Sequence, residues 1–188
     1  AAHEDGKADY SSEVGTLASA GGDAVAVIGY LDQGGKGIIQ GSLDSGAFDT
    51  FILSDGMIGD SLTDTFGKSL NKSFGSLPGS TGKGAGIFAK VAGKAGIDPS
   101  GPYTGESYDA AALIVLAMQA GGSADRGSIA KNVMAVANGP GKKIYPGQLK
   151  KALDLLAKGK AVDYEGATGV IFTDVGEHVG NFLEKEIK

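Results

Sequence analysis

The chain has 188 residues, of which 41% are hydrophobic, and a formal net charge of -5 at pH 7. Because it is acidic and holds a single arginine, Arg126, the composition argues against a nucleic-acid partner. The absence of cysteine excludes disulfides and thiolate metal sites, and no apolar run reaches the roughly 18 residues of a membrane span.

Metal and leader motifs are also missing from the sequence. His3 and His178 lie far apart, and neither has a metal-ligand neighbour at useful spacing, so no metal site is expected. Residues 1–5 show neither the basic nor the apolar region of a signal peptide. If the protein is exported, we expect that its signal has been removed or lies upstream of this chain.

The first third of the chain alternates helix and strand patterns. Apolar spacing predicts helices over residues 9–20, 35–45 and 60–70, and the short apolar runs 24–28 and 51–53 predict strands. Short apolar strands bounded by turn residues are typical of a parallel sheet that is buried on both faces. The pattern therefore predicts a right-handed βαβ unit within an α/β fold.

Two side chains with binding chemistry follow the predicted strands. Tyr30 comes just after the first strand and Asp55 just after the second. Ligands of open α/β sheets bind in the crevice outside the carboxyl ends of the strands, so both residues point to one site for a small cationic or zwitterionic ligand. A structural interpretation stays open beside this one, since Ser-Asp-Gly is a common turn and a tyrosine at a strand end often only packs.

A glycine-rich segment, residues 73–86, is predicted to be a loop. A Walker A motif there requires Gly where Leu77 stands, and Ser or Thr where Gly84 stands. Residues 84–89 fit the pattern G-x-G-x-x-A, but no strand is predicted before them, so a dinucleotide site is not favoured.

The chain after this loop is predicted to be helical until near its end. Helical patterns cover residues 87–95, 106–120 and 128–137, and another helix opens at Pro146. The helix over 106–120 is apolar nearly all round and is expected to be buried on most sides. These helices need a sheet to pack on, and the sequence supplies too few strands for them.

The last residues return to strand character. Apolar runs at 168–172 and 179–187 flank a turn pattern at 174–177 and predict a hairpin.

Several motifs occur in an order and spacing typical of one family. They are K-A-D-Y-S at 7–11, D-A-V-A-V-I-G-Y at 23–30, F-I-L-S-D-G at 51–56, D-P-S at 98–100, Y-E-G-A-T-G at 164–169 and F-T-D-V-G-E at 172–177. Together they resemble the C-terminal half of extracytoplasmic solute-binding proteins of ABC transporters, of the branched-chain amino-acid (Leu/Ile/Val-binding) type. Thr173 departs from the family pattern, which usually has Asp there.

This resemblance implies a type I periplasmic-binding-protein fold, in which two α/β lobes joined by three crossovers clamp a ligand. Residues 1–75 would form the βαβ core of the second lobe. Residues 76–165 would be helices that pack on a first lobe mostly absent from this chain, and residues 166–188 a crossover hairpin that returns to the second lobe. The remaining N-terminal half of the same protein is then an implied partner.

The resemblance also implies roles for the two candidate residues. Tyr30 matches the second-lobe aromatic residue that lines the cleft. Asp55 matches, one residue further along, the acidic residue that binds the ligand's α-ammonium, which is often Glu in amino-acid binders. The first-lobe groups that hold the α-carboxylate have no counterpart in this sequence.

The implied function is solute binding for an ABC importer, in the periplasm or otherwise outside the cytoplasm. The implied partners are a small ligand such as an amino acid and a membrane permease, with no cofactor, metal or catalytic residue.

Two alternatives stay open at this point. A ligand-sensing regulator can use the same fold, and a DNA-binding or membrane segment elsewhere in the gene would favour it. A nucleotide-dependent α/β enzyme has less support, because the sequence offers no good phosphate loop and no histidine paired with an acid or a serine.

Overall fold

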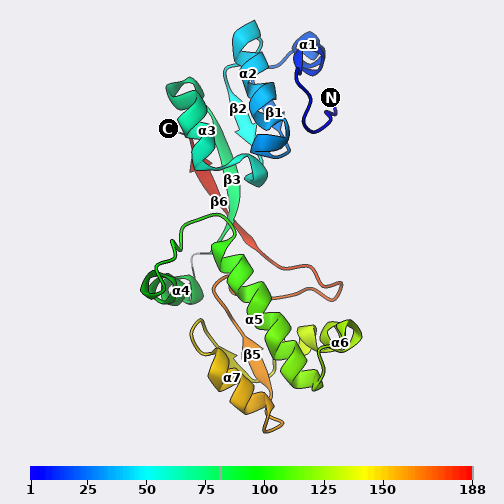
Figure 1. The fold of residues 1–188 in the computed structure, drawn as a ribbon, viewed down its shortest axis with the longest axis vertical. Coiled ribbons are helices and arrows are strands. Elements are labelled where there is room, and N and C mark those ends of the chain that lie inside the picture. Colours follow the sequence, from blue (N-terminus) through cyan, green and yellow to red (C-terminus); the bar gives the residue numbers. More distant parts are fainter. Residues whose placement is uncertain (81, 188) are drawn as a thin grey trace. The chain divides into compact units, whose positions relative to one another are not determined.

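The computed structural model describes residues 1–80 and 82–187, which divide into two compact units. Unit 1 comprises residues 1–77 together with the chain from Leu183 onward, and unit 2 comprises residues 78–182 (Figure 1). Strand β3 (Phe74–Gly79) leads from unit 1 into unit 2, and strand β6 (Asn181–Glu186) leads back.

Unit 1 is built on a sheet with strand order β1-β2-β3-β6. Before β3, its elements are α1 (Ser11–Ala20), β1 (Val25–Val27), η1 (Leu31–Gln33), α2 (Gly35–Ser45), β2 (Phe51–Leu53), η2 (Asp55–Met57), α3 (Asp60–Phe66) and η3 (Gly67–Leu70). Strand β1 pairs with β2 in parallel, and β2 pairs with β3 in parallel. The predicted β1–α2–β2 unit is therefore present, whereas the predicted helix over 60–70 is an α-helix followed by a 3-10 turn.

One face of this sheet is buried and the other is exposed. Val25, Val27, Phe51 and Leu53 point into the core of unit 1, where α2 contributes the fully buried Ile39. On the other face, Ala26 pairs with Ile52 and Ile52 pairs with Phe74. Ile52 and Phe74 are each 41% exposed. The prediction that these strands are buried on both faces is thus wrong for the described residues.

Unit 2 contains a second βαβ unit, which the sequence patterns did not predict. Its elements are α4 (Lys83–Lys94), α5 (Thr104–Gly121), α6 (Arg126–Ala137), β4 (Lys142–Ile144), α7 (Leu149–Leu156) and β5 (Val162–Tyr164). Strands β4 and β5 pair in parallel, with α7 between them in the chain. The expectation that the middle of the chain is all helical is therefore wrong.

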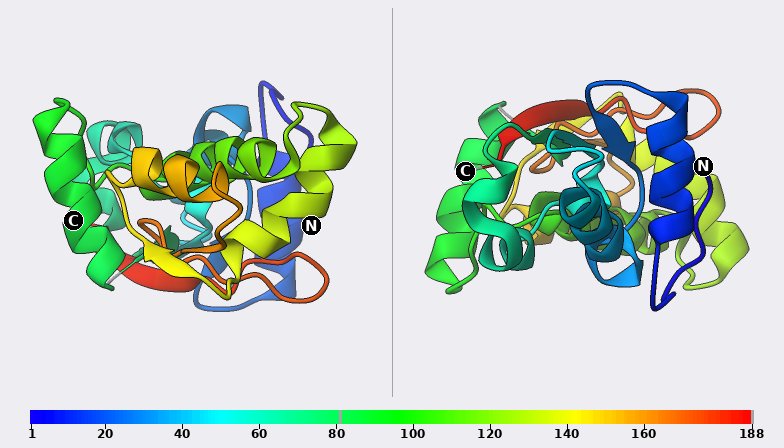
Figure 2. Two further views of the ribbon diagram at one scale, coloured as in Figure 1. Left: turned by 90° about the horizontal axis from the view of Figure 1, so that it is seen from below. Right: turned by 90° about the horizontal axis from the view of Figure 1, so that it is seen from above.

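Helices α5 and α6 pack against each other and against the short β4–β5 sheet (Figure 2). Leu113 and Leu116 of α5 and Val136 of α6 are buried in this core. The opposite side of α5 is exposed, with Ile114 at 47% and Val115 at 39%. Burial of α5 on most sides is thus not observed within the described residues.

The segment 73–86 is not a loop throughout. It contains strand β3, and helix α4 begins at Lys83 rather than at residue 87. A strand therefore does precede the G-x-G-x-x-A pattern, contrary to the expectation. Gly84 nevertheless lies within α4 and packs against the carbonyl oxygen of Gly166, so it serves helix packing instead of a phosphate loop.

The C-terminal hairpin is only partly formed. The amide of Gly176 bonds the carbonyl of Thr173 at 2.9 Å, and the amide of Thr173 bonds the carbonyl of Glu177 at 2.8 Å, which makes the predicted turn. Before the turn, a single antiparallel bridge joins Phe172 to His178 in place of the strand predicted over 168–172. After the turn, β6 belongs to the four-stranded sheet of unit 1.

Candidate functional site

The carboxyl ends of β1 and β2 are fastened together by the side chain of Ser54. Its Oγ accepts a hydrogen bond from the Gly29 amide at 3.2 Å and lies 3.3 Å from the Gly29 carbonyl, to which it donates. The Ser54 amide also bonds the carbonyl of Val27 at 3.2 Å. Because both strands run in parallel, these contacts bring the segments that follow them side by side.

Tyr30 and Asp55 lie on these two adjacent segments. Tyr30 precedes η1 and is 63% exposed, and Asp55 is the first residue of η2 and is half-buried. Gly56, the neighbour of Asp55 in the chain, lies against the Tyr30 segment: a Cβ at this position would lie 2.5 Å from the Gly29 carbonyl oxygen and 2.8 Å from Cδ1 of the Tyr30 ring. The structure therefore brings the two predicted site residues to one edge of the sheet.

The backbone around Tyr30 is held by the start of α2. The Tyr30 carbonyl accepts hydrogen bonds from the amides of Gln33 at 3.2 Å and Gly35 at 3.1 Å. Gly35 in turn packs against the side chain of Met57, which is fully buried at the end of η2. The two segments that carry Tyr30 and Asp55 are thus anchored to the core of unit 1.

The Asp55 carboxylate makes one local contact. Its Oδ1 accepts a hydrogen bond from the Gly56 amide at 2.9 Å, as expected for the turn interpretation. Among the residues that the structure describes, none donates to the other oxygen, Oδ2. A carboxylate oxygen with free acceptor capacity can bind a small ammonium group by a charge-assisted hydrogen bond, and an exposed tyrosine ring on the adjacent segment can attract the same cation through its face.

A second polar cluster, absent from the sequence-based predictions, surrounds Asp109 of α5. This side chain is 2% exposed. Its carboxylate accepts hydrogen bonds from the Tyr164 hydroxyl at 2.8 Å, the Ala167 amide at 2.8 Å, the Thr168 amide at 2.8 Å and the Thr168 hydroxyl at 2.9 Å. The cluster fastens the segment after β5 to α5. A carboxylate within the apolar helix pattern could have signalled it, because a buried charge needs partners.

The geometry of the Asp109 cluster depends on two further residues. Gly166 has a φ of 58° and passes so close to the Asp109 carboxylate that a Cβ would collide with it. Burial, together with the negative charge of Asp109, raises the pKa of the Tyr164 hydroxyl well above its ordinary range. Tyr164 therefore remains a neutral donor, and its hydrogen bond to Asp109 joins β5 to α5.

Unit 2 also contains a small cavity of about 200 Å³ beside this cluster. Its lining includes the side chains of Glu106, Thr168, His178 and Asn181. Within the described residues, no set of three His, Asp or Glu side chains could hold a metal ion. The described helices likewise include none that is both long and apolar enough to cross a membrane.

Comparison with known proteins shows which fold the chain has. No family model matches the chain. The structure superposes on a leucine-binding protein, LivK, from Thermotoga maritima with a TM-score of 0.70 and 19% identity, covering 97% of this chain and 46% of that one. It also superposes on a type 1 periplasmic binding protein from Bordetella pertussis Tohama I with a TM-score of 0.58 and 21% identity, over 72% of this chain and 40% of that one.

One curated relative is similar in sequence. The substrate-binding protein BasB of a chemotactic signal transduction system in Halobacterium salinarum is 37% identical over 90 residues, which are 47% of this chain and 22% of BasB. The chain thus has the fold of part of a type 1 periplasmic binding protein, as predicted, and it resembles proteins that bind ligands. It spans less than half the length of each of these proteins.

Proposed function

We propose that this chain is part of an extracytoplasmic solute-binding protein that serves an ABC importer and binds an amino acid or a similar small polar solute. The observation that carries the proposal is the placement of Tyr30 and Asp55 just after two adjacent strand ends in a binding-protein fold. The proteins that the chain resembles are binding proteins, and this supports a role without catalysis.

In this mechanism, Asp55 accepts a hydrogen bond from the ammonium group of the ligand through its open oxygen, Oδ2. The Tyr30 ring covers an adjacent part of the ligand. Gly56 lets the Asp55 segment approach the Tyr30 ring because it has no Cβ that would collide with this ring. The charge-assisted hydrogen bond contributes about 1.5–3 kcal/mol of net binding free energy.

The exposed row Ala26–Ile52–Phe74 supports a further part of the proposal. Parallel sheets are almost always covered on both faces, yet Ile52 and Phe74 are each 41% exposed. We infer that the rest of a two-lobe protein packs here and supplies the remaining ligand contacts. Ligand then favours the closed arrangement by its contacts with both lobes.

The proposal is tested by isothermal titration calorimetry on the full-length gene product. A thermal-shift screen of the twenty amino acids identifies the ligand, because binding to the native state raises the unfolding temperature. Asp55→Ala is expected to weaken binding of that ligand by about 2–5 kcal/mol, the range for unpairing a buried charge. Asp64→Ala, at an exposed position on α3, is the matched control and should leave the affinity unchanged.

Two results would count against this function. A dissociation constant that Asp55→Ala leaves unchanged would remove Asp55 as the ammonium partner. If none of the amino acids or related small amines binds, the ligand class is wrong.

A sensory role is the second candidate, and the name of one relative favours it. BasB is the substrate-binding protein of a chemotactic system. A deletion strain separates the two roles: loss of solute uptake with normal chemotaxis indicates transport. Loss of the chemotactic response with normal uptake indicates sensing.

A further inference from the structure

Positive charge gathers on one stretch of unit 2. Residues 142–160 hold six lysines and one acidic residue, Asp154. The whole chain has 17 basic and 22 acidic side chains, so the remaining residues carry 11 basic and 21 acidic ones. The stretch is thus a basic region on an otherwise strongly acidic protein.

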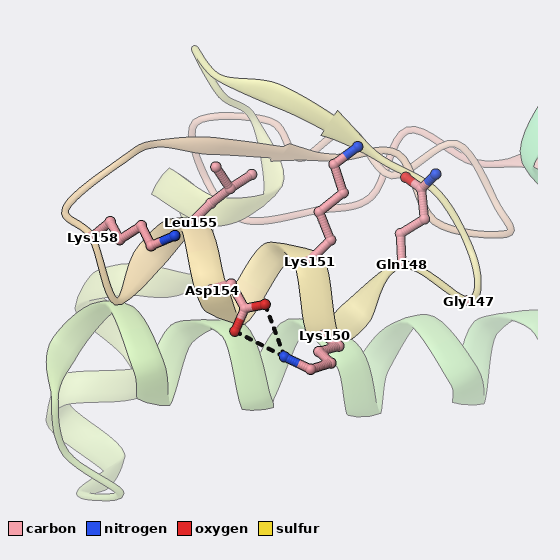
Figure 3. A pocket seen from close by; sticks show the side chains of 7 residues that line it. All are labelled: Gly147, Gln148, Lys150, Lys151, Asp154, Leu155 and Lys158. Atoms are coloured by element: carbon pink, nitrogen blue, oxygen red, sulfur yellow. Dashed lines mark hydrogen bonds and ion pairs between the residues drawn. The ribbon is translucent and has the colours of Figure 1, made fainter.

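Three of these lysines line an open groove along α7. The groove has a volume of about 520 Å³, and its lining includes Lys150, Lys151, Asp154, Leu155 and Lys158 (Figure 3). Lys150 pairs with Asp154 at 2.9 Å, one helical turn away. Among the described residues, Lys151 and Lys158 form no ion pair, and both are exposed. The groove therefore presents uncompensated positive charge.

The remaining lining suits a polypeptide. Gln148 accepts a hydrogen bond from the Tyr145 amide through Oε1 at 3.2 Å, which leaves its amide nitrogen to donate to a backbone carbonyl. Leu155 adds an apolar surface at the base, where it packs against the core of unit 2.

We propose that this groove, formed by Gln148, Lys151, Leu155 and Lys158, docks a carboxylate-rich segment of a partner protein. Oppositely charged surfaces steer association and fix the orientation of the partners. The positive charge of this groove, on an otherwise acidic chain, is complementary to the carboxylates of such a segment. The proposal concerns a protein contact on unit 2, whereas Tyr30 and Asp55 belong to unit 1, and it holds whichever solute is bound.

Other anionic partners fit the groove less well. Nucleic acid binding uses aromatic stacking and arginine, whereas neither lines this groove. Adsorption to an anionic membrane gains about 1 kcal/mol of binding free energy per lysine. Two free lysines without an exposed apolar anchor would therefore bind a membrane only weakly. Arginine side chains, which bind phosphate in a bidentate manner, are absent from the lining of this groove.

The experiment is fluorescence anisotropy with labelled poly-L-glutamate and the full-length gene product. Binding is expected at low salt and is expected to weaken steadily from about 50 mM to about 300 mM NaCl, because salt screens exposed charges. The variant Lys151→Glu/Lys158→Glu should bind at least about tenfold more weakly. The milder double variant Lys151→Gln/Lys158→Gln should have an affinity for poly-L-glutamate between those of the charge-reversed variant and the unmodified protein.

A matched control distinguishes an effect of the groove on the affinity from an effect of the net charge of the protein. Lys90→Glu/Lys94→Glu changes the charge by the same amount at two exposed positions on α4 and should alter the affinity by less than about twofold. Circular dichroism checks that every variant is folded. Equal losses in the two charge-reversed variants would overturn the proposal, and so would the absence of binding. Stronger binding to a single-stranded oligonucleotide or to phosphatidylglycerol vesicles would also overturn it.

Discussion

Asp109 shows how one buried carboxylate can hold two distant parts of the chain together. Its partners lie 55 to 59 residues further along, and each is a donor that would lose its acceptor without it. Asp109→Ala is therefore expected to lower the free energy of unfolding by about 3–5 kcal/mol, measured by urea denaturation. Asp174→Ala, at an exposed position in the turn, should change it by less than about 0.5 kcal/mol. Similar values for the two variants would contradict a structural role for the cluster.

Tyr164 makes the stability of the protein depend on pH in the alkaline range. Burial and the charge of Asp109 raise the pKa of its hydroxyl in the folded state. The contribution of this group is thus fully present below the unfolded pKa of about 10 and is lost as the pH rises above it, by up to about 1.4 kcal/mol per pH unit. Tyr164→Phe is expected to be less stable at pH 7 and to lose stability less steeply above pH 10.

The measurement for Tyr164→Phe is urea denaturation at a series of pH values. The difference in unfolding free energy between the unmodified protein and Tyr164→Phe should narrow above pH 10. Parallel curves for the Tyr164 variant would show that this hydroxyl titrates equally in both states.

Gly56 and Gly15 are expected to respond in opposite ways to an added methyl group. Gly56 follows Asp55 in η2, and a Cβ there meets the Gly29 carbonyl at 2.5 Å, so Gly56→Ala should destabilise the protein by about 1–3 kcal/mol. Gly15 lies in α1 with nothing near its Cβ position. Gly15→Ala should stabilise it by about 0.5–1 kcal/mol, because alanine favours a helix. Thermal unfolding measures both, and a Gly56→Ala variant that is as stable as the unmodified protein would contradict the close approach at Gly56.

Sequence patterns predicted elements well where hydrophobic spacing was clear. The β1–α2–β2 unit and the helices α5 and α6 were predicted close to their observed bounds. Strands β4 and β5 were missed because each has three residues, and K-K-I and V-D-Y mix charged with apolar side chains. Strand β3 was missed because glycine and proline within it are typical of loops.

The candidate site was predictable only in part, because some of its contacts join residues that are far apart in the sequence. The rule for strand ends identified Tyr30 and Asp55 from local sequence, since both follow recognisable strands. No local pattern gives the contact between Gly56 and the Tyr30 ring, which arises when the two strands pair. The Asp109 cluster likewise depends on contacts between residues more than 50 positions apart.

At the scale of the whole molecule, the exposed face of the unit 1 sheet is the feature that most needs a partner. The double variant Ile52→Thr/Phe74→Thr keeps β-forming side chains while it removes apolar surface. In the 188-residue chain it should reduce binding of a hydrophobic dye and cost about 1 kcal/mol or less of unfolding free energy, since both side chains are already partly exposed. Val175→Thr/Val179→Thr, at two exposed positions of unit 2, is the control for a general loss of apolar surface.

The same double variant tests whether the rest of a two-lobe protein covers this face. In the full-length gene product, a covered Ile52 and Phe74 would lie in a packed interface, where large-to-small changes cost about 2–5 kcal/mol because they remove contacts and leave a cavity. The cost should therefore be larger in the full-length product than in the 188-residue chain. An equal cost in both, together with undiminished dye binding by the full-length product, would mean that the face stays open. Its apolar row would then serve association with another molecule.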